Sequence, residues 1–470
     1  MQYKVAKVAM AFMVASLLLA QPLWASEEEL RQEIAALKAK LAEVDQLKVK
    51  VAELEKQVGE QKCSILAQQG TVQEVKASLQ NAVPAQNLIK YAPGEGVELP
   101  CGFKMQADAT FVLQGTSNAN NVPQGSRKAE CDASWSADLF IEKAFDDWGL
   151  ALLHIEPGNG SAAESRLNLF SNVNRDSNET NSNMKVTELW YEHNLFNKQF
   201  TVTAGKIDPE NYLDQNVYAH DETTQFLGRI FRSSPAVEWP NDNTLGASIA
   251  IAPEVMSYLV LSASYLNAND SWSDVFSKPF ASAQLTFTPA KVFGYDEKMW
   301  GGNYRIYWWY NGLDHQKYVA QGESPADDAK NKNTGFGLSF DQMITDNFGV
   351  FTRFAWQRPD IVTVSESMDS APVEAAWSAG IQINGKLWKR EDDVLACAVG
   401  QAIPSKACKD AGNGGAPEGH FEAYYKIKVT KNLALSPDIQ YIWNPHGIDQ
   451  SYQGYEHSIF VYGMRGQLDF

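Results

Sequence analysis

The sequence predicts an all-β transmembrane barrel of about 16 antiparallel strands, preceded by an α-helical coiled coil. Three observations predict this fold class. The chain begins with an export-type segment over residues 1–25, and residues 26–83 carry a heptad repeat. Residues 102–470 alternate apolar and polar side chains with a period of two, after a linker over residues 84–101.

Composition narrows the classes of protein that this chain can belong to. The 470 residues include 57 Asp+Glu against 40 Lys+Arg, and the formal net charge of −17 argues against nucleic acid as a partner. Aromatic residues make up 11%, which supplies enough apolar surface to exclude intrinsic disorder. The one long apolar run lies at the N-terminus, so a helical membrane protein is excluded. A large soluble protein or a transmembrane β-barrel remains.

The first 25 residues predict a signal peptide. Lys4 and Lys7 give a positive start, an apolar stretch follows over residues 8–20, and Ala25 precedes an acidic run. This order is typical of export signals that are cleaved after a small residue. The alternative is a membrane anchor, but 13 apolar residues are too few to span about 30 Å of hydrocarbon as a helix.

Residues 26–83 predict a coiled coil. Apolar residues recur at alternating spacings of four and three, in two heptad frames offset by a three-residue step. So narrow an apolar stripe fits a like helix better than a globular core, so we expect self-association into a homotrimer. The alternative is an isolated amphipathic helix. After export this segment would lie in the periplasm, close to peptidoglycan.

The barrel prediction depends on sixteen strand-like segments and on their connections. Short turns alternate with long polar connections, as in barrels whose two ends face different compartments. The last segment places Phe460, Tyr462 and Leu468 on one face and Arg465 on the other, which suits lipid outside and water inside. A soluble β-sandwich is the alternative. The segments are 103–111, 133–142, 148–156, 185–193, 199–207, 246–252, 256–266, 279–288, 301–311, 333–341, 346–357, 375–388, 393–401, 418–429, 431–443 and 458–470.

Several segments resemble the carbohydrate-selective porins of the OprB type. The most specific is the stretch 206–227, followed by 302–311 and 390–395. The resemblance covers roughly 100–470 and implies a 16-stranded outer-membrane barrel that passes sugars by diffusion. The coiled coil departs from the simplest members and looks more like variants with an extension toward the cell wall. Such variants leave open a general or ion-permeable porin that acts mainly as a spacer between outer membrane and cell wall.

Two arginines are candidates for a constriction of the pore. Arg166 and Arg175 lie in the long segment 157–184, which could fold into the barrel and narrow it. An exposed surface loop is equally compatible with its composition.

A second group of candidates follows from the resemblance and from the strand pattern. The motif match makes Lys206, Asp221 and Glu222 structural or lumen residues, and an ion-pair network that orders the loop is the alternative to a ligand role. Three further charged residues lie close to them in the sequence, namely Asp208, Arg229 and Arg232. Of these three, Arg229 is a candidate for the pore lining. On the strand 301–311, Arg305, Tyr307 and Trp309 share the face expected toward the lumen. Trp308 and its alternate neighbours share the face expected toward lipid.

The remaining chemistry of the sequence is sparse. Cys397 and Cys408 are close enough in sequence to form a disulfide in an oxidising compartment, and free thiols are the alternative. No His/Cys cluster has metal-ligand spacing, and we expect no cofactor. A secreted sugar-acting enzyme would need two carboxylates about 5–10 Å apart, and no pair can be singled out. The prediction is therefore a porin, not an enzyme, that lets small sugars or other polar solutes diffuse across the outer membrane.

Overall fold

The computed structural model describes Lys50 and residues 90–92, 96–121, 129–176, 183–240, 242–269, 271–294, 300–317, 331–362, 373–411, 414–448 and 456–470. The chain divides into two compact units, Met1–Leu88 and Ile89–Phe470. Of the first unit only Lys50 is described, so the predicted signal peptide and coiled coil lie outside the described residues. The second unit is described by itself below.

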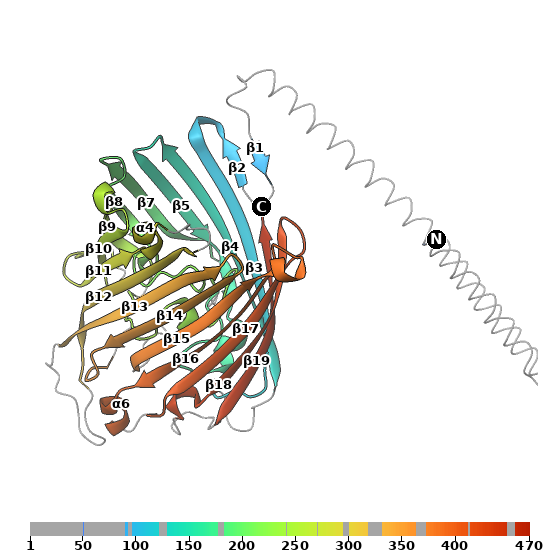
Figure 1. Cartoon of the computed structure of the whole chain (residues 1–470). Helices are drawn as coiled ribbons and strands as arrows, with labels where there is room; N and C mark the ends of the chain where they lie inside the picture. Colours follow the sequence, from blue (N-terminus) through green and yellow to red (C-terminus); the bar gives the residue numbers. More distant parts are fainter. Residues whose placement is uncertain are drawn as a thin grey trace, which may run out of the picture. The chain divides into compact units, whose positions relative to one another are not determined.

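The second unit is a closed antiparallel barrel (Figure 1). Each strand pairs with its sequence neighbours, and the last strand pairs with β3, which closes the sheet. Of the nineteen described strands, β1, β2 and β6 are short additions, which leaves sixteen in the wall. The additions are β1 (Lys90–Ala92), β2 (Gly96–Leu99) and β6 (Gly158–Gly160).

The wall strands confirm the predicted number, and each of the sixteen predicted segments overlaps one of them. They are β3 (Phe103–Thr116), β4 (Glu130–Phe145), β5 (Gly149–Glu156), β7 (Lys185–Leu195), β8 (Phe200–Ile207), β9 (Thr244–Ile251), β10 (Leu259–Asn267), β11 (Pro279–Phe287), β12 (Gly302–His315), β13 (Asn331–Thr345), β14 (Phe348–Gln357), β15 (Val373–Asn384), β16 (Val394–Pro404), β17 (Glu418–Lys428), β18 (Leu433–Trp443) and β19 (Ser458–Asp469).

The two faces of the wall carry different side chains, as the period of two predicts. On β19, Phe460, Tyr462 and Leu468 are exposed on the outer face, while Val461 and Arg465 are buried on the inner face. Apolar side chains that are exposed outward on a closed barrel suit contact with lipid.

Helices in the described residues are all short, and none is long and apolar enough to cross a membrane. They lie in the connections between strands and at strand ends. They are η2 (Pro100–Gly102), η4 (Ala162–Arg166), η5 (Pro209–Asn211), α3 (Arg229–Arg232), η6 (Glu254–Met256), α4 (Pro289–Phe293), η7 (Gly385–Trp388), α6 (Lys406–Asp410) and η8 (Pro445–Gly447).

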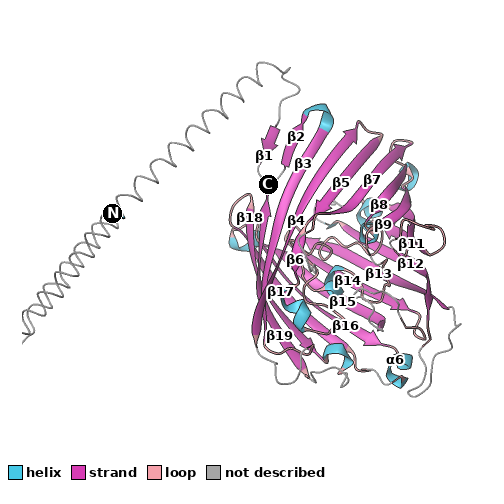
Figure 2. Ribbon diagram, turned by 180° about the vertical axis from the view of Figure 1, so that it is seen from behind, coloured by secondary structure: helices cyan, strands magenta, loops and turns pink. Residues whose placement is uncertain are grey.

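The connection between β8 and β9 fills much of the barrel. We call residues 208–240 the inner loop. Its apolar side chains, including Phe226 and Phe231, are buried against inward side chains of β10 to β17, and Figure 2 shows short helices inside the ring of strands. We call this part of the barrel, β10 to β17, the packed wall.

Small residues on the packed wall make room for the inner loop. The inward positions of β16 include Ala396, Ala398 and Ala402, and α3 of the inner loop contacts this strand. A Cβ added at Gly400 would lie 3.1 Å from Cδ1 of Ile230 in α3. Larger side chains here would therefore displace the inner loop.

Candidate functional site

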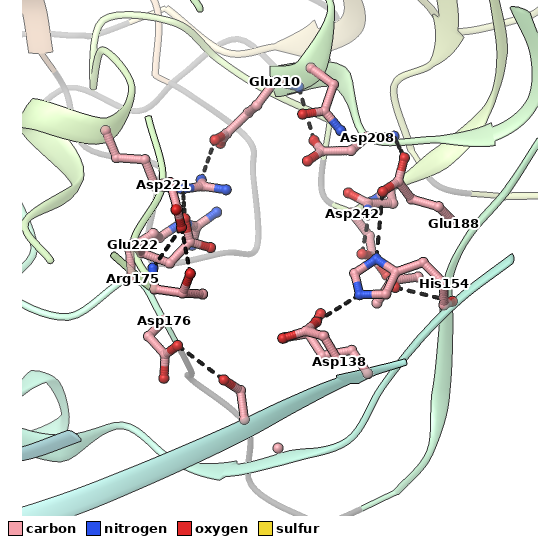
Figure 3. A pocket seen from close by; sticks show the side chains of 18 of the residues that line it. Asp138, His154, Arg175, Asp176, Glu188, Asp208, Glu210, Asp221, Glu222 and Asp242 are labelled. Atoms are coloured by element: carbon pink, nitrogen blue, oxygen red, sulfur yellow. Dashed lines mark hydrogen bonds and ion pairs between the residues drawn. The ribbon is translucent and has the colours of Figure 1, made fainter. Parts of the chain in front are cut away.

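A pocket of about 730 Å³ remains inside the barrel, between the inner loop and the opposite wall. Figure 3 shows side chains converging on it from both sides. We call it the lumen pocket. Its lining comes from strands β3, β4, β5 and β7, from the segment after β6, and from the inner loop and the residues that follow it.

The lumen pocket is strongly acidic. Ten carboxylates line it against three basic side chains. The carboxylates are Asp108, Asp138, Glu156, Asp176, Glu188, Asp208, Glu210, Asp221, Glu222 and Asp242, and the basic side chains are Arg175, Lys185 and Arg232. A confined space lined mainly by one sign of charge attracts the opposite sign. The lumen pocket can therefore concentrate cations and can hydrogen-bond polar solutes.

The wall side of the lumen pocket is built from three neighbouring strands. His154 on β5 is paired in register with Phe140 on β4 and Glu188 on β7, so the three side chains point to the same inner face. The His154 ring stacks on Phe140, with 4.2 Å between ring centroids. Its Nε2 lies 2.6 Å from Oδ1 of Asp138, and its Nδ1 lies 3.5 Å from Oε1 of Glu188. The imidazole is thereby fixed between two carboxylates.

The loop side is held by an arginine and by local turns. Arg232, at the end of α3, forms ion pairs with both Glu210 and Glu222. Asp208 precedes η5 and accepts a hydrogen bond from the backbone N–H of Glu210 at 2.9 Å. The carboxylate of Asp221 accepts hydrogen bonds from the N–H and hydroxyl of Thr223, which form a tight turn.

Burial and neighbouring charges shift the pKa values of the acidic side chains of the inner loop, upward for some and downward for others. Burial raises the pKa of Asp208 to about 7, and the nearby Glu210 adds to the rise. Burial also raises the pKa of Glu222, against the charge of Arg232. At Glu210 burial is opposed by several positive charges, Arg232 the strongest, which together lower the pKa. At Asp221 burial is opposed by the hydrogen bonds from Thr224 and Thr223 and by the charge of Arg465, which together lower the pKa.

Three of the predicted site residues line the lumen pocket. Arg175, Asp221 and Glu222 come together there, although they lie on different connections. The ion pair between Glu222 and Arg232 also matches the alternative interpretation, a network that orders the loop.

The described part of the segment 157–184 packs inside the wall. Leu167, Leu169 and Val173 are buried against inward side chains of β18 and β19. Arg166 ends η4 and pairs with Glu130 at 2.5 Å and Asp132 at 2.9 Å. It is not part of the lining of the lumen pocket.

Lys206, which the motif match made a structural or lumen residue, lies on the outer face of β8. It is paired in register with Leu189, which is 55% exposed on the outer face, and its Nζ donates to the carbonyl of Val186 at 2.8 Å. Alternation on β8 puts Lys206 on this outer face, whereas the buried Thr203 and Ile207 point inward. The motif match alone does not report this phase.

The predicted faces of β12 are confirmed, but none of its three inward candidates, Arg305, Tyr307 and Trp309, lines the lumen pocket. Trp308 is 48% exposed on the outer face, whereas Tyr307 and Trp309 are buried in the core formed with the inner loop. Arg305 faces inward and forms an ion pair with Asp341 at 2.5 Å. Arg229 is also fully buried and does not line the lumen pocket. An inward position is therefore not the same as a pore-lining position.

The disulfide considered for Cys397 and Cys408 is not formed. Both are thiols in the structure. Cys397 lies on β16, whereas Cys408 is buried in α6 with its Sγ 3.8 Å from the carbonyl oxygen of Gly414.

Most of the acids in the lumen pocket were not identified from the sequence. Asp138 and Glu188 lie on other strands than His154 and Glu156, so strand register and not sequence spacing brings the group together. The sequence did carry one signal for them. An ionisable residue at an inward-facing position of a membrane strand must contact water or an ion partner. Many inward positions on other strands carry the same signal. Only the path of the inner loop decides which inward positions it covers and which remain open to the lumen pocket.

The closed barrel with a polar pocket in its lumen defines the class of outer-membrane porins. Residues 102–470 match the family described as carbohydrate-selective porin, OprB family, and the chain belongs to this family. A comparison with curated proteins found no match.

A comparison with solved structures found similar chains. The high-pH structure of Pseudomonas putida OprB superposes with a TM-score of 0.63 at 16% identity, over 78% of this chain and 94% of that chain. The low-pH structure of the same protein gives a TM-score of 0.48 at 14% identity, covering 78% and 93%. The outer-membrane channel DcaP of Acinetobacter baumannii gives 0.46 at 10% identity, covering 78% and 97%. The first of these, at 16% identity, shows a likeness of fold alone.

Proposed function

We propose that this chain is an outer-membrane porin through which small carbohydrates and other small polar solutes diffuse passively. The observation that carries the proposal is the lumen pocket inside the closed wall. Its volume of about 730 Å³ lies in the range of roughly 300–1,000 Å³ that small-molecule sites have. Hydrogen-bonding side chains line it, together with the rings of Phe140 and Trp239. Such a lining suits hydroxylated solutes.

The compartments follow from the proposal. The segment 1–25 would direct export, and the coiled coil 26–83 would lie in the periplasm, where it would hold a homotrimer near peptidoglycan. The short turns, such as the one between β13 and β14, would then face the periplasm. The lipids of the outer membrane would contact the apolar outer face of the wall.

A second candidate function is a general porin that prefers cations. The ten carboxylates against three basic side chains favour it, since rings of acidic side chains select for cations in channels. Of the basic three, Arg232 is paired with two acids and Lys185 with Asp242 at 2.6 Å. The excess negative charge therefore faces the solute.

Liposome swelling tests the two candidates. Liposomes that contain the purified chain should swell in a graded series of neutral sugars, faster for smaller sugars, because diffusion through the lumen pocket is limited by size. Liposomes without protein are the control. Swelling with salts of small cations but with no sugar would replace the first candidate by the second. An absence of swelling with every solute would contradict both.

A further inference from the structure

The geometry points to a divalent-cation site on the wall of the lumen pocket, formed by Asp138, His154 and Glu156. The donor atoms of these three side chains all lie within 4.8 Å of one another. In the part of the chain that the structure describes, no other group of three His, Cys, Asp or Glu side chains is so arranged. Ligand atoms around a metal at about 2.0–2.2 Å stand roughly 3–3.5 Å apart, so small side-chain rotations suffice.

The imidazole of His154 is held as a metal ligand would be. Its Nδ1 lies 3.5 Å from the carboxylate of Glu188, and its Nε2 faces Asp138. Glu188 is itself fixed, because its Oε2 accepts a hydrogen bond from Nε1 of Trp190 at 3.0 Å. A carboxylate that orients the second nitrogen of a ligating histidine is the usual outer partner in metal sites. At 3.5 Å Nδ1 makes no hydrogen bond to Glu188 in this structure, so Glu188 would act as the positioning residue once a small rotation closes that distance.

A separate observation is a second buried carboxylate of the lumen pocket, Asp176, with one oxygen that no described group donates to. Asp176 is 94% buried, since its exposed fraction is 6%, and it lines the lumen pocket across from Asp138 (Figure 3). Its Oδ1 accepts a hydrogen bond from Ser136 at 3.0 Å. Its Oδ2 has no hydrogen-bond partner among the described residues. A buried carboxylate oxygen without a donor is costly unless a proton or a cation supplies the missing charge.

The donor set selects the class of cation. One imidazole with carboxylates suits a borderline transition-metal ion such as Zn²⁺, whereas Mg²⁺ prefers oxygen ligands alone in a near-ideal octahedron. The histidine must be neutral to bind, so the ion takes the place of the proton shared by Nε2 and Asp138, and that proton leaves to solvent. The site thus binds Zn²⁺ more weakly as the pH falls.

Calorimetric titration of the full-length chain in detergent with Zn²⁺ tests the site. Its cysteines are first blocked with N-ethylmaleimide, since thiolates also bind Zn²⁺. One site per chain is expected, and Glu156→Gln and His154→Gln should each weaken the affinity by about tenfold or more. The matched control is Asp242→Asn, which removes a carboxylate of the same pocket outside the ligand set. It should change the affinity far less.

Two results would overturn the site. The first is a Zn²⁺ affinity that neither Glu156→Gln nor His154→Gln changes. The second is competition by Mg²⁺ at concentrations equal to those of Zn²⁺, which would reveal a general attraction to negative charge. Heat-modifiable gel mobility shows whether each variant folds. If His154→Gln does not fold, Glu156→Gln carries the test.

Conductance in planar bilayers adds a functional readout that rests on the proposed function. Because the site lies in the lumen pocket, Zn²⁺ should lower the conductance, and EDTA should restore it. Glu156→Gln should conduct and should resist Zn²⁺. A chain that conducts but binds no Zn²⁺ overturns the site alone. A chain that binds Zn²⁺ at this site but never conducts overturns the proposed function alone.

Discussion

The two sides of the barrel interior have the same backbone pattern and opposite chemistry. The inward positions of the packed wall, such as Trp309 and Phe351, are buried against the inner loop. Those of β4, β5 and β7, such as Asp138 and His154, face the lumen pocket. The alternation of a membrane strand therefore fixes which face is inside. What covers that face decides whether it is core or channel.

Charges follow the same division. On the packed wall several buried charges form ion pairs, as in Arg353 with Asp214 at 3.1 Å and His315 with Glu238 at 2.8 Å, and the buried Glu418 and Glu422 of β17 accept hydrogen bonds from backbone N–H groups. Unmatched charge there would pay a large desolvation cost. In the lumen pocket the carboxylates outnumber the basic side chains. Water and passing cations can stabilise this excess of negative charge. The comparison identifies the pocket side as the functional one and the packed wall as its support.

The largest expected effect is a loss of stability on replacing one of two adjacent tryptophans of β12, of which one lies in the core and the other on the lipid face. Trp309→Ala should lower the free energy of unfolding by about 3–5 kcal/mol, because it empties space in the core between the wall and the inner loop. Trp308→Ala is the matched control, because the Trp308 side chain is 48% exposed on the outer face. This substitution should lower the free energy of unfolding clearly less. Urea titration followed by heat-modifiable mobility measures both. Equal losses would mean that the packed wall is not a core.

A smaller effect concerns the charge of the lumen pocket. In water one carboxylate contributes about 1 kcal/mol to a cation 4 Å away, so Glu156→Gln should lower the K⁺/Cl⁻ permeability ratio by up to about fivefold. The reversal potential in a KCl gradient, with EDTA present, measures this ratio. Glu142→Gln is the control, because Glu142 lies on β4 in the same inward phase but outside the lining of the lumen pocket. A ratio that falls equally in both variants would contradict the assignment of selectivity to the pocket.

The smallest effect is a pH dependence of the same ratio. Burial raises the pKa of Asp208 to about 7, so this carboxyl is neutral below that pH and negative above it. Cation preference should therefore rise between pH 6 and pH 8, and Asp208→Asn should flatten the rise. Reversal potentials at the two pH values, again with EDTA, provide the measurement. A slope that Asp208→Asn leaves unchanged would place the titrating group elsewhere.

Much of the candidate site was out of reach of sequence reasoning. Arg175, Asp221 and Glu222 were identified through the inward segment and the motif stretch, and they line the lumen pocket. Lys206 lies in the same motif stretch but on the outer face, because one step along a strand changes the face. Asp138, His154 and Glu188 come from three strands, and their meeting depends on strand register.

The sequence by itself determined the barrel, the number of its strands and the two faces of β12 and β19. It could do so because a strand between lipid and a wet interior must alternate at every residue. Only the tertiary structure decided which inward residues form a core and which form the lumen pocket. That choice depends on the path of the inner loop across the barrel, and its contacts join residues far apart in sequence, such as Phe226 with Phe351 and Tyr424. The alternation of apolar and polar residues along one strand does not predict such contacts.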